Sequence, residues 1–253
     1  MFNIDHFFVY DLLGRLVRED NKALGETKTF VYDNNGNILT QRKFEFTLKD
    51  DLSIEELDST DIIYLYEGDR LLSFGSNLLT YNDSGLLTKY QNNQLTWTDL
   101  KQLQSYGSTS FTYDGLGRRK SKNNTQYFYD SNGKLIQETR NGKTIKYLYD
   151  NTEISGFIYE GEQYFYIKNT QGDVIALVLK GNVVVRYLYD GWGNHTVCNP
   201  NGDENTSELF IGNINPIRYR GYYYDVETGL FMVGHRYYIR NGEDGYHLMI
   251  LNT

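Results

Sequence analysis

The sequence predicts an all-β protein, built as one long antiparallel meander of β-hairpins that winds as it proceeds. The first observation behind this prediction is internal repetition, because a tyrosine-bearing segment runs into a short Asp/Asn/Gly turn nine times along the chain. Such repetition indicates the architecture before any single residue does. The second observation is composition, because 24 Tyr, 13 Phe and 24 Gly with only 2 Pro favour strands and turns. Apolar residues at helical spacing are hard to find.

The repeated unit is Tyr-Asp-x-x-Gly followed by Arg, Asn or Lys. It occurs at residues 10–15, 32–37, 113–118, 129–134 and 189–194, in a longer form at 224–229, and more loosely at 81–85, 149–150 and 166–173. We assign a structural role to Tyr32, Asp33, Gly36, Tyr113, Asp114, Gly117, Tyr129, Asp130, Gly133, Tyr189, Asp190 and Gly193. An Asp that opens a type I turn accepts backbone N–H bonds, and a Gly three residues later can adopt the left-handed conformation. Each unit therefore predicts a hairpin with a type I turn and a glycine bulge.

Tighter turns are predicted between these units, at Asn141-Gly142, Glu160-Gly161 and Gly181-Asn182. Along 146–149 and 186–189, Tyr and Leu alternate, so both faces of the sheet are partly apolar. The spacing of the units is too irregular for propeller blades or a strict solenoid. A winding antiparallel sheet accounts better for this pattern.

Charge and composition exclude several functional classes. The chain of 253 residues can bury a substantial core and contains no evident linker, while its net charge of -8 and pI near 5.1 argue against a nucleic-acid partner. We expect the scattered Lys and Arg side chains to be solvated. No apolar run is long enough for a membrane span, and residues 1–6 show no signal-peptide pattern. The lone Cys198 excludes an internal disulfide framework and a Cys-cluster zinc site.

The C-terminal third carries a sharper motif, at residues 215–230 and 236–238. Its structural residues are Pro216, Arg218, Tyr219, Gly221, Tyr224, Asp225, Glu227, Gly229 and Arg236. Together with the Tyr-Asp units, this segment is similar to the core signature of Rhs/YD-repeat proteins, which include polymorphic toxins, wall-associated proteins, Tc-toxin components and teneurins. The resemblance implies a sheet that spirals into a hollow, tyrosine-lined shell, which in complete members encloses a C-terminal toxin. We therefore expect a partial YD-repeat shell, with a repeat region at 1–214 and the core signature at 215–238.

The segment 239–253 departs from the family pattern, which continues with Pro-x-x-Gly-Arg, an aromatic residue and a Ser/Asn-x-Asp element. Back-translation with permitted codons, read one base earlier, recovers much of that missing pattern. We therefore predict that the tail is aberrant and frameshifted, and that the native design ran further. Nucleotide sequence lacking those codons would contradict this hypothesis.

Catalytic and metal sites are not expected. Self-cleavage in the complete family resembles aspartyl-protease chemistry, but the required segment lies beyond Tyr238, and Asp225 is expected to cap its own turn. The four histidines, His6, His195, His235 and His247, lack zinc-motif spacing, and Cys198 lacks an evident His partner. The acidic turn at 33–37 is explained without calcium. No phosphate-binding glycine loop opens a helix, so we predict no cofactor.

Two sets of side chains leave alternatives open. Tyrosine rings with Trp97 or Trp192 could stack on glycans, although packing explains so many rings better. Arg218, Arg220 and Arg236 are expected to pair with Asp225 and Glu227 and to fix the terminal strands, with an anion site as the alternative.

We conclude from the sequence that the chain is a non-catalytic shell fragment, either toxin-enclosing or wall-associated, that functions in interbacterial competition without its own toxin. The alternatives are a carbohydrate-binding surface module and an autoprotease. Expected partners are the remainder of a shell or a toxin chain, and cell-surface glycans under the first alternative. We expect an extracellular or wall-associated location as part of a longer protein. Open sheet edges predict self-association unless charges at Lys43, Lys120 and Lys122 block it.

Overall fold

The computed structural model describes residues 6–47, 58–234, 236–240 and 247–250. Strands dominate it, and the first twenty are as follows. They are β1 (His6–Tyr10), β2 (Leu16–Asn21), β3 (Glu26–Tyr32), β4 (Ile38–Glu45), β5 (Thr60–Glu67), β6 (Arg70–Phe74), β7 (Asn77–Tyr81), β8 (Leu87–Tyr90), β9 (Asn93–Trp97), β10 (Leu103–Tyr106), β11 (Thr109–Tyr113), β12 (Arg119–Lys122), β13 (Thr125–Tyr129), β14 (Leu135–Arg140), β15 (Lys143–Asp150), β16 (Glu153–Tyr159), β17 (Glu162–Lys168), β18 (Val174–Leu179), β19 (Asn182–Tyr189) and β20 (His195–Cys198).

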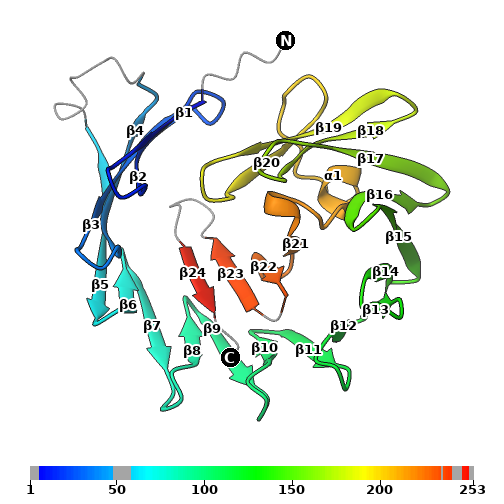
Figure 1. Ribbon diagram of the computed structural model, residues 1–253, viewed down its shortest axis with the longest axis horizontal. Helices are drawn as coiled ribbons and strands as arrows, with labels where there is room; N and C mark the ends of the chain where they lie inside the picture. The colour runs from blue at the N-terminus through cyan, green and yellow to red at the C-terminus, as the bar shows by residue number, and fades with distance from the viewer. Residues whose placement is uncertain (1–5, 48–57, 235, 241–246, 251–253) are drawn as a thin grey trace.

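These twenty strands form one antiparallel meander in which each strand pairs with the next along the chain. The sheet curves into a ring (Figure 1), and β1 and β20 do not pair with each other among the strands that the structure describes. The predicted all-β meander is therefore confirmed.

The C-terminal segment lies inside this ring (Figure 1). It comprises α1 (Ile211–Ile214), a 3-10 turn (Tyr219–Gly221), and the strands β21 (Tyr223–Asp225), β22 (Leu230–Val233), β23 (Arg236–Arg240) and β24 (His247–Ile250). The four strands pair in sequence to form a second antiparallel sheet, which we call the inner sheet. The sequence did not predict that the core signature would fill the ring. The proposed frameshift in 239–253 stays a prediction, and residues 241–246 and 251–253 lie outside the described part.

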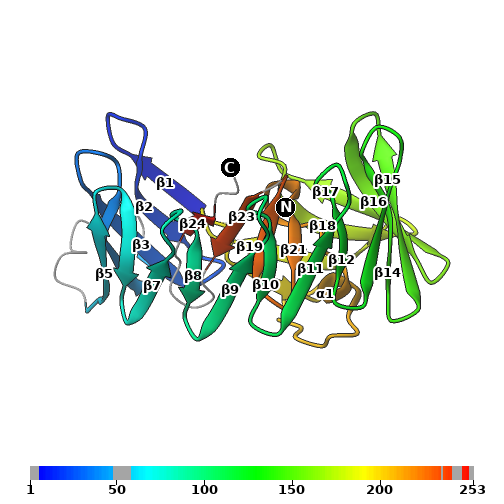
Figure 2. The same cartoon turned by 90° about the horizontal axis from the view of Figure 1, so that it is seen from below.

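Within the twenty-stranded sheet, whose strands are seen from the side in Figure 2, the Tyr-Asp turns follow odd-numbered strands, so they lie along one edge of that sheet. At Asp114, Oδ1 accepts the backbone N–H groups of Leu116 and Arg118, both at 2.9 Å, and the Asp114 carbonyl accepts from Gly117. Gly117 has a φ of 78°, and the strand register shifts at Tyr113, as a glycine bulge requires. The same side-chain cap recurs at Asp11, Asp33, Asn82, Asp130, Asn169 and Asp190. The predicted turn is thus confirmed at these seven units.

Two-residue turns lie along the opposite rim. Asn141 and Gly142 have φ values of 47° and 79°, so both central residues are left-handed, as in a type I′ hairpin. Glu160-Gly161 forms an equivalent turn. The turn predicted at Gly181-Asn182 lies one residue earlier, at Lys180-Gly181, because Asn182 already belongs to β19.

A ladder of tyrosine hydroxyls joins successive hairpins. Tyr129 at the end of β13 donates its hydroxyl to the carbonyl of Arg119 at 2.9 Å, while the Arg118 guanidinium lies 4.9 Å from the Tyr129 ring centroid. Equivalent hydroxyl bonds form at Tyr32, Tyr81, Tyr113, Tyr149 and Tyr189. Burial raises the pKa of Tyr129 to about 12, so the hydroxyl stays a donor at neutral pH.

The inner sheet divides the ring into two hydrophobic cores. Leu230, Tyr237 and Ile239 pack with the buried residues of β5–β11, whereas Phe231 packs with those of β13–β20. Because successive side chains of a strand point to opposite faces, β22 serves both cores. The inner sheet is therefore an integral part of the packing.

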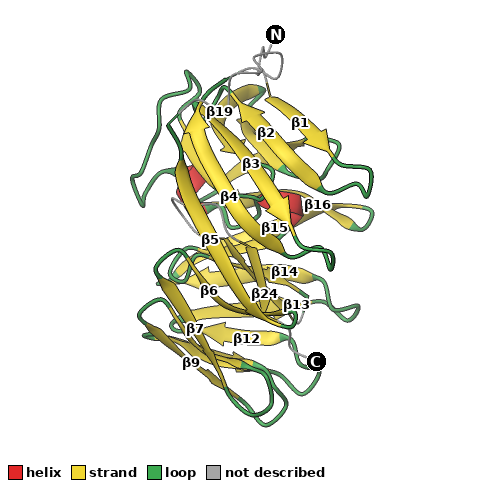
Figure 3. Ribbon diagram, turned by 90° about the vertical axis from the view of Figure 1, so that its left-hand side faces the viewer, coloured by secondary structure: helices red, strands yellow, loops and turns green. Residues whose placement is uncertain are grey.

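The first four strands, seen side by side in Figure 3, form an arm with a different interior. Their buried residues include Glu19, Asp20, Asn21, Thr27, Lys28 and Gln41. The arm meets the β19–β20 turn through side chains: Asn21 Nδ2 donates to the Tyr189 carbonyl, and Glu19 accepts from the Gly191 N–H at 2.8 Å. Polar contacts therefore close the ring where backbone pairing does not.

The three lysines considered as edge protection lie away from the two outer strands. Lys43 lies on β4, and Lys120 and Lys122 lie on β12, all within the meander and away from β1 and β20. Lys122 is also buried, with 2% of its surface exposed, so the expectation that Lys and Arg would all be solvated fails there.

Candidate functional site

The site that connects the two sheets is a buried cluster of charges around Asp225. Its Oδ1 accepts from Arg119 Nη1 at 2.8 Å and its Oδ2 from Arg119 Nη2 at 2.7 Å, a bidentate pair between β12 and β21. Lys122 donates a third bond to Oδ1 at 2.9 Å and also bonds Glu227 at 2.6 Å. Asp225 is 0% exposed and Arg119 only 2%. We call Arg119, Lys122, Asp225 and Glu227 the anchor cluster.

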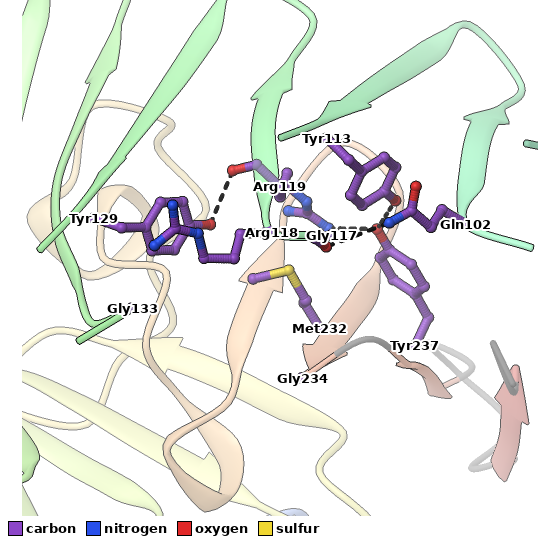
Figure 4. Close-up of a pocket in the computed structure, with 10 residues that line it drawn as sticks. All are labelled: Gln102, Tyr113, Gly117, Arg118, Arg119, Tyr129, Gly133, Met232, Gly234 and Tyr237. Atoms are coloured by element: carbon purple, nitrogen blue, oxygen red, sulfur yellow. Dashed lines mark hydrogen bonds between the residues drawn. The ribbon is translucent and has the colours of Figure 1, made fainter. Parts of the chain in front are cut away.

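Aromatic rings enclose the guanidinium of Arg119. The centroids of Phe111, Tyr127, Tyr223 and Tyr237 lie 4.9 to 5.7 Å from it, within the range of cation–π attraction. The Tyr237 hydroxyl accepts from Arg119 Nη2 at 3.0 Å and contacts the Tyr113 hydroxyl at 2.9 Å (Figure 4). A cavity of about 270 Å³ adjoins this cage. The cage contains residues of both sheets, so it fixes their relative position.

The electrostatics of the anchor cluster favour its ionised form. Burial acts to raise the pKa of Asp225, but the charges of Arg119 and Lys122 outweigh it and hold that pKa below the usual range. Burial likewise acts to lower the pKa of Lys122, but Asp225 and its neighbours raise it. A carboxylate held ionised between two cations is suited to anchoring and poorly suited to sharing a proton with a second acid.

Two sequence expectations about these residues were wrong. Asp225 does not cap its own turn with its carboxylate, because the N–H groups of Thr228 and Gly229 bond its backbone carbonyl. The carboxylates of Asp225 and Glu227 also pair with Arg119 and Lys122, more than a hundred residues away in sequence, and not with the neighbouring signature arginines. Proximity in sequence misled because Asp225 at the end of β21 and Glu227 in the following turn both contact β12.

The signature arginines bind elsewhere. Arg218 donates to the carbonyls of Asn215, Gly212 and Asn213 at 3.1 to 3.2 Å and to His195 Nε2. The backbone N–H of Arg220 donates to Asp173 at 2.8 Å, and the Arg220 side chain forms a looser ion pair with the same carboxylate at 3.9 Å. Arg236 is exposed at the start of β23.

The other signature residues support the entry of the chain into the ring. The Pro216 carbonyl accepts from the Tyr224 N–H at 2.7 Å, and the Tyr219 hydroxyl donates to the Gly191 carbonyl at 2.9 Å. Gly221 and Gly229 have φ values of 71° and 72°, which favour glycine. These contacts hold the segment that leads into the inner sheet.

A second buried charge contact joins β14 to β21. Glu138, 0% exposed, pairs with Arg140 and accepts from the Tyr223 hydroxyl at 2.6 Å. Arg140 also donates to that hydroxyl and to the carbonyl of Ile214, both at 3.0 Å.

A third buried charge contact lies at the closure of the ring, where Lys28 bonds Asp190 at 2.9 Å. The sequence did not reveal Arg119, Glu138 and Lys28 as site residues, because a charged residue in a strand does not show whether its face of the sheet is buried.

The glycan candidates prove to have structural contacts. Trp97 donates its indole N–H to the Leu87 carbonyl at 2.7 Å and packs on the first core, so it replaces the tyrosine of a repeat unit. Trp192 packs edge-on against Phe30 at 5.6 Å, and its carbonyl accepts from Tyr238. The two tryptophans lie in different hairpins and form no shared platform.

The histidines and Cys198 are the remaining candidates. No group of His, Cys, Asp and Glu suited to a metal ion occurs within residues 6–47, 58–234, 236–240 and 247–250. Cys198 is buried, and burial raises the pKa of its thiol, which disfavours a reactive thiolate.

A cavity of about 760 Å³ opens between β14–β15, the 204–214 loop and the inner sheet, and both His195 and Arg218 line it.

These features agree with comparisons to known proteins. A sequence model of the teneurin YD-shell matches residues 5–241. The chain belongs to the teneurin YD-shell family. Among curated relatives, the tRNA nuclease WapA of Bacillus subtilis (strain 168) is 35% identical over 137 residues, which cover 44% of this chain. The tRNA3(Ser)-specific nuclease WapA of Bacillus spizizenii is likewise 35% identical over 137 residues. The chain spans about 6% of the length of these proteins.

Among solved structures, the YD-shell chain resembles TcdB2-TccC3 without its hypervariable C-terminal region. The TM-score is 0.51 at 16% identity, over 92% of this chain and 15% of that one. This likeness concerns the fold alone. Among the described residues of this YD-shell chain, no helix is long and apolar enough to cross a membrane.

Proposed function

We propose that this chain is a non-catalytic scaffold segment of a YD-repeat shell, one that encloses a toxin or is wall-associated and that functions in interbacterial competition. The anchor cluster carries the proposal. It uses the buried charges of the core signature to hold the inner sheet against the ring, and its low-pKa carboxylate favours anchoring over acid–base chemistry.

The partners we propose are the remainder of a longer shell or a toxin chain, in an extracellular or wall-associated location. The chain spans only a small part of its curated relatives, whose names describe tRNA nucleases. We assign that nuclease activity to no residue of this chain. The glycan-binding alternative receives no support from Trp97 and Trp192, since both are engaged in packing.

The non-catalytic claim is tested by incubating the purified chain with total tRNA and following the tRNA on a gel. The intact mass of the chain is measured in parallel across pH 4 to 8. We expect no tRNA cleavage and one unchanged mass. Cleavage of tRNA or of the chain itself, abolished by Asp225→Asn while the variant remains folded, would overturn the proposal.

The biological claim is tested by competition in culture. A producing strain that carries Asp225→Asn should be outcompeted in mixed culture by its parent, although both grow equally well alone. A strain with the surface change Asp114→Asn serves as the matched control. Equal fitness of the Asp225→Asn strain in mixed culture would contradict a role in competition.

A further inference from the structure

One contact between the ring and the inner segment involves a group that titrates near neutral pH. His195 begins β20, while Arg218 precedes the 3-10 turn inside the ring. Arg218 Nη1 donates to His195 Nε2, and the other ring nitrogen, Nδ1, lies 3.2 Å from the Gly193 carbonyl. A carbonyl only accepts and a guanidinium only donates. The network therefore assigns the proton to Nδ1 and the lone pair to Nε2, the neutral form of the imidazole.

Protonation of Nε2 is incompatible with this contact. Arginine stays charged at all physiological pH values, so it cannot accept a hydrogen bond from an imidazolium. Two cations would then stand in direct contact. Arg218 is also held by the carbonyls of Asn215, Gly212 and Asn213, so it cannot withdraw without losing further bonds.

The surroundings of His195 are aromatic on three sides, with the rings of Tyr189, Tyr224 and Phe231 at 4.9 to 6.0 Å. The fourth side faces the cavity of about 760 Å³, which gives protons a route to the imidazole. Charged groups lining that cavity are Arg140 and Lys143 from the β14–β15 hairpin, Glu204 and Glu208 from the loop after β20, and Glu227 from the turn after β21. Of these, Arg140 pairs with Glu138, Lys143 with Glu160, and Glu227 with Lys122. On the turn before β20, Asp190 bonds Lys28 and Asn194.

We propose that His195 and Arg218 form an acid-sensitive latch, which holds the core signature inside the ring at neutral pH and weakens as the pH falls. The sign follows from proton linkage. The released state can protonate His195 freely and the latched state cannot, so release takes up a proton and is favoured by acid. A single proton increases the release equilibrium constant by at most tenfold per pH unit. The latch goes beyond the proposed scaffold function and does not depend on it.

The chain offers a control of opposite sign. His6 Nε2 contacts Glu19 at 2.7 Å, so protonation of His6 strengthens its contact, whereas protonation of His195 breaks its own. Acid should therefore act differently at the two histidines. His235 and His247 have side chains outside the described part, and their glutamine variants serve as additional controls.

The test is hydrogen exchange of the peptide that contains β22, measured by mass spectrometry from pH 7.5 to 5.0 and corrected for intrinsic exchange. In the wild-type chain, we expect protection to fall with decreasing pH at up to tenfold per unit. In His195→Gln, whose amide oxygen can still accept from Arg218 without titrating, protection should be independent of pH. The variants His6→Gln, His235→Gln and His247→Gln should retain the wild-type slope.

An unchanged slope in a folded His195→Gln chain would overturn the latch, and so would a flat wild-type profile. If His195→Gln fails to fold by circular dichroism, Arg218→Gln decides the question. It leaves His195 in place without the guanidinium of residue 218, so the pH slope should be lost, and a retained slope refutes the proposal. These outcomes are independent of the tRNA and mass tests of the scaffold function.

Discussion

Replacement of Asp225 by Asn isolates the charge of the anchor cluster, because the amide keeps the shape of the carboxylate. Asp225 accepts three charge-assisted hydrogen bonds of 2.7 to 2.9 Å while 0% exposed. Removing one partner of a buried pair leaves uncompensated charge and costs about 3–5 kcal/mol. Lys122 retains Glu227, and Arg119 retains Tyr237. We therefore expect a loss of about 3 kcal/mol, the lower end of that range.

Urea unfolding, followed by circular dichroism and tryptophan fluorescence, measures this loss. Trp97 packs on the first core and Trp192 lies near the second, so the fluorescence reports on both sides of the ring. Because native domains are stable by only about 5–15 kcal/mol, the shift in midpoint should be large.

Asp114→Asn provides the matched control at the same position of another repeat unit. Its carboxylate caps a turn and pairs with Arg118 at a partly exposed site, and Asn can still cap, as Asn82 and Asn169 do. The loss there should stay within about 1 kcal/mol. Equal effects of Asp225→Asn and Asp114→Asn would refute the anchoring argument.

Four further outcomes are expected. Tyr129→Phe removes a hydroxyl bond to a β12 carbonyl and should lower the free energy of unfolding by about 0.5–1.5 kcal/mol in urea titrations. Gly193→Ala should destabilise the fold more than Gly36→Ala. Both glycines have a left-handed φ, but only at Gly193 would an added Cβ lie 2.6 Å from the Tyr219 ring. Thermal unfolding of the two variants checks this order. The contribution of the Asp225 carboxylate to stability should be complete above the ordinary carboxyl pKa of 3.8, and it should be lost as the pH falls through the lowered pKa of the folded state. Curves of unfolding free energy against pH for the wild type and Asp225→Asn should therefore converge only in strong acid. Among the described residues the outer edge of β1 has no strand partner, whereas Glu204 and Asn205 pair with the outer edge of β20. The edge of β1 predicts concentration-dependent association in light scattering after size exclusion, and a monomer at all concentrations would contradict it.

Sequence reasoning captured the ring because the ring is built from local contacts. Each turn cap joins residues two and four apart, and each tyrosine hydroxyl reaches the adjacent hairpin. The spacing of the repeat units is kept even where the residue type changes. Tyr81, Trp97, Tyr113 and Tyr129 are spaced 16 residues apart, a signal that could have identified Trp97 as a repeat position. The turn after it also keeps the backbone geometry, with Lys101 at a φ of 59° in place of glycine.

The anchor cluster could not be predicted in the same way. Arg119 and Asp225 are 106 residues apart, and nothing in the local sequence around Arg119 distinguishes it from the exposed Lys120 beside it. The bulge opposite Tyr113, which inserts Lys120 between the paired residues Arg119 and Ser121, places Arg119 and Lys122 on the same buried face. Proximity within the signature favoured Arg218, Arg220 and Arg236 as the partners of Asp225 and Glu227, and that inference failed for this reason.

These two kinds of contact explain how one chain specifies both the curved outer sheet and the position of the inner sheet. Turn caps and tyrosine hydroxyl bonds act within and between neighbouring hairpins of the outer sheet. They therefore do not determine where the inner sheet packs. Buried charges supply that information, because an unpaired charge in an apolar interior is costly and only one placement of the inner sheet pairs Asp225 with both Arg119 and Lys122. A shift of β21 by one residue would point that carboxylate to the opposite face, since strand side chains alternate. The anchor cluster therefore contributes to fixing the register of the inner sheet, together with the buried rings of Tyr223 and Tyr224 on the same strand.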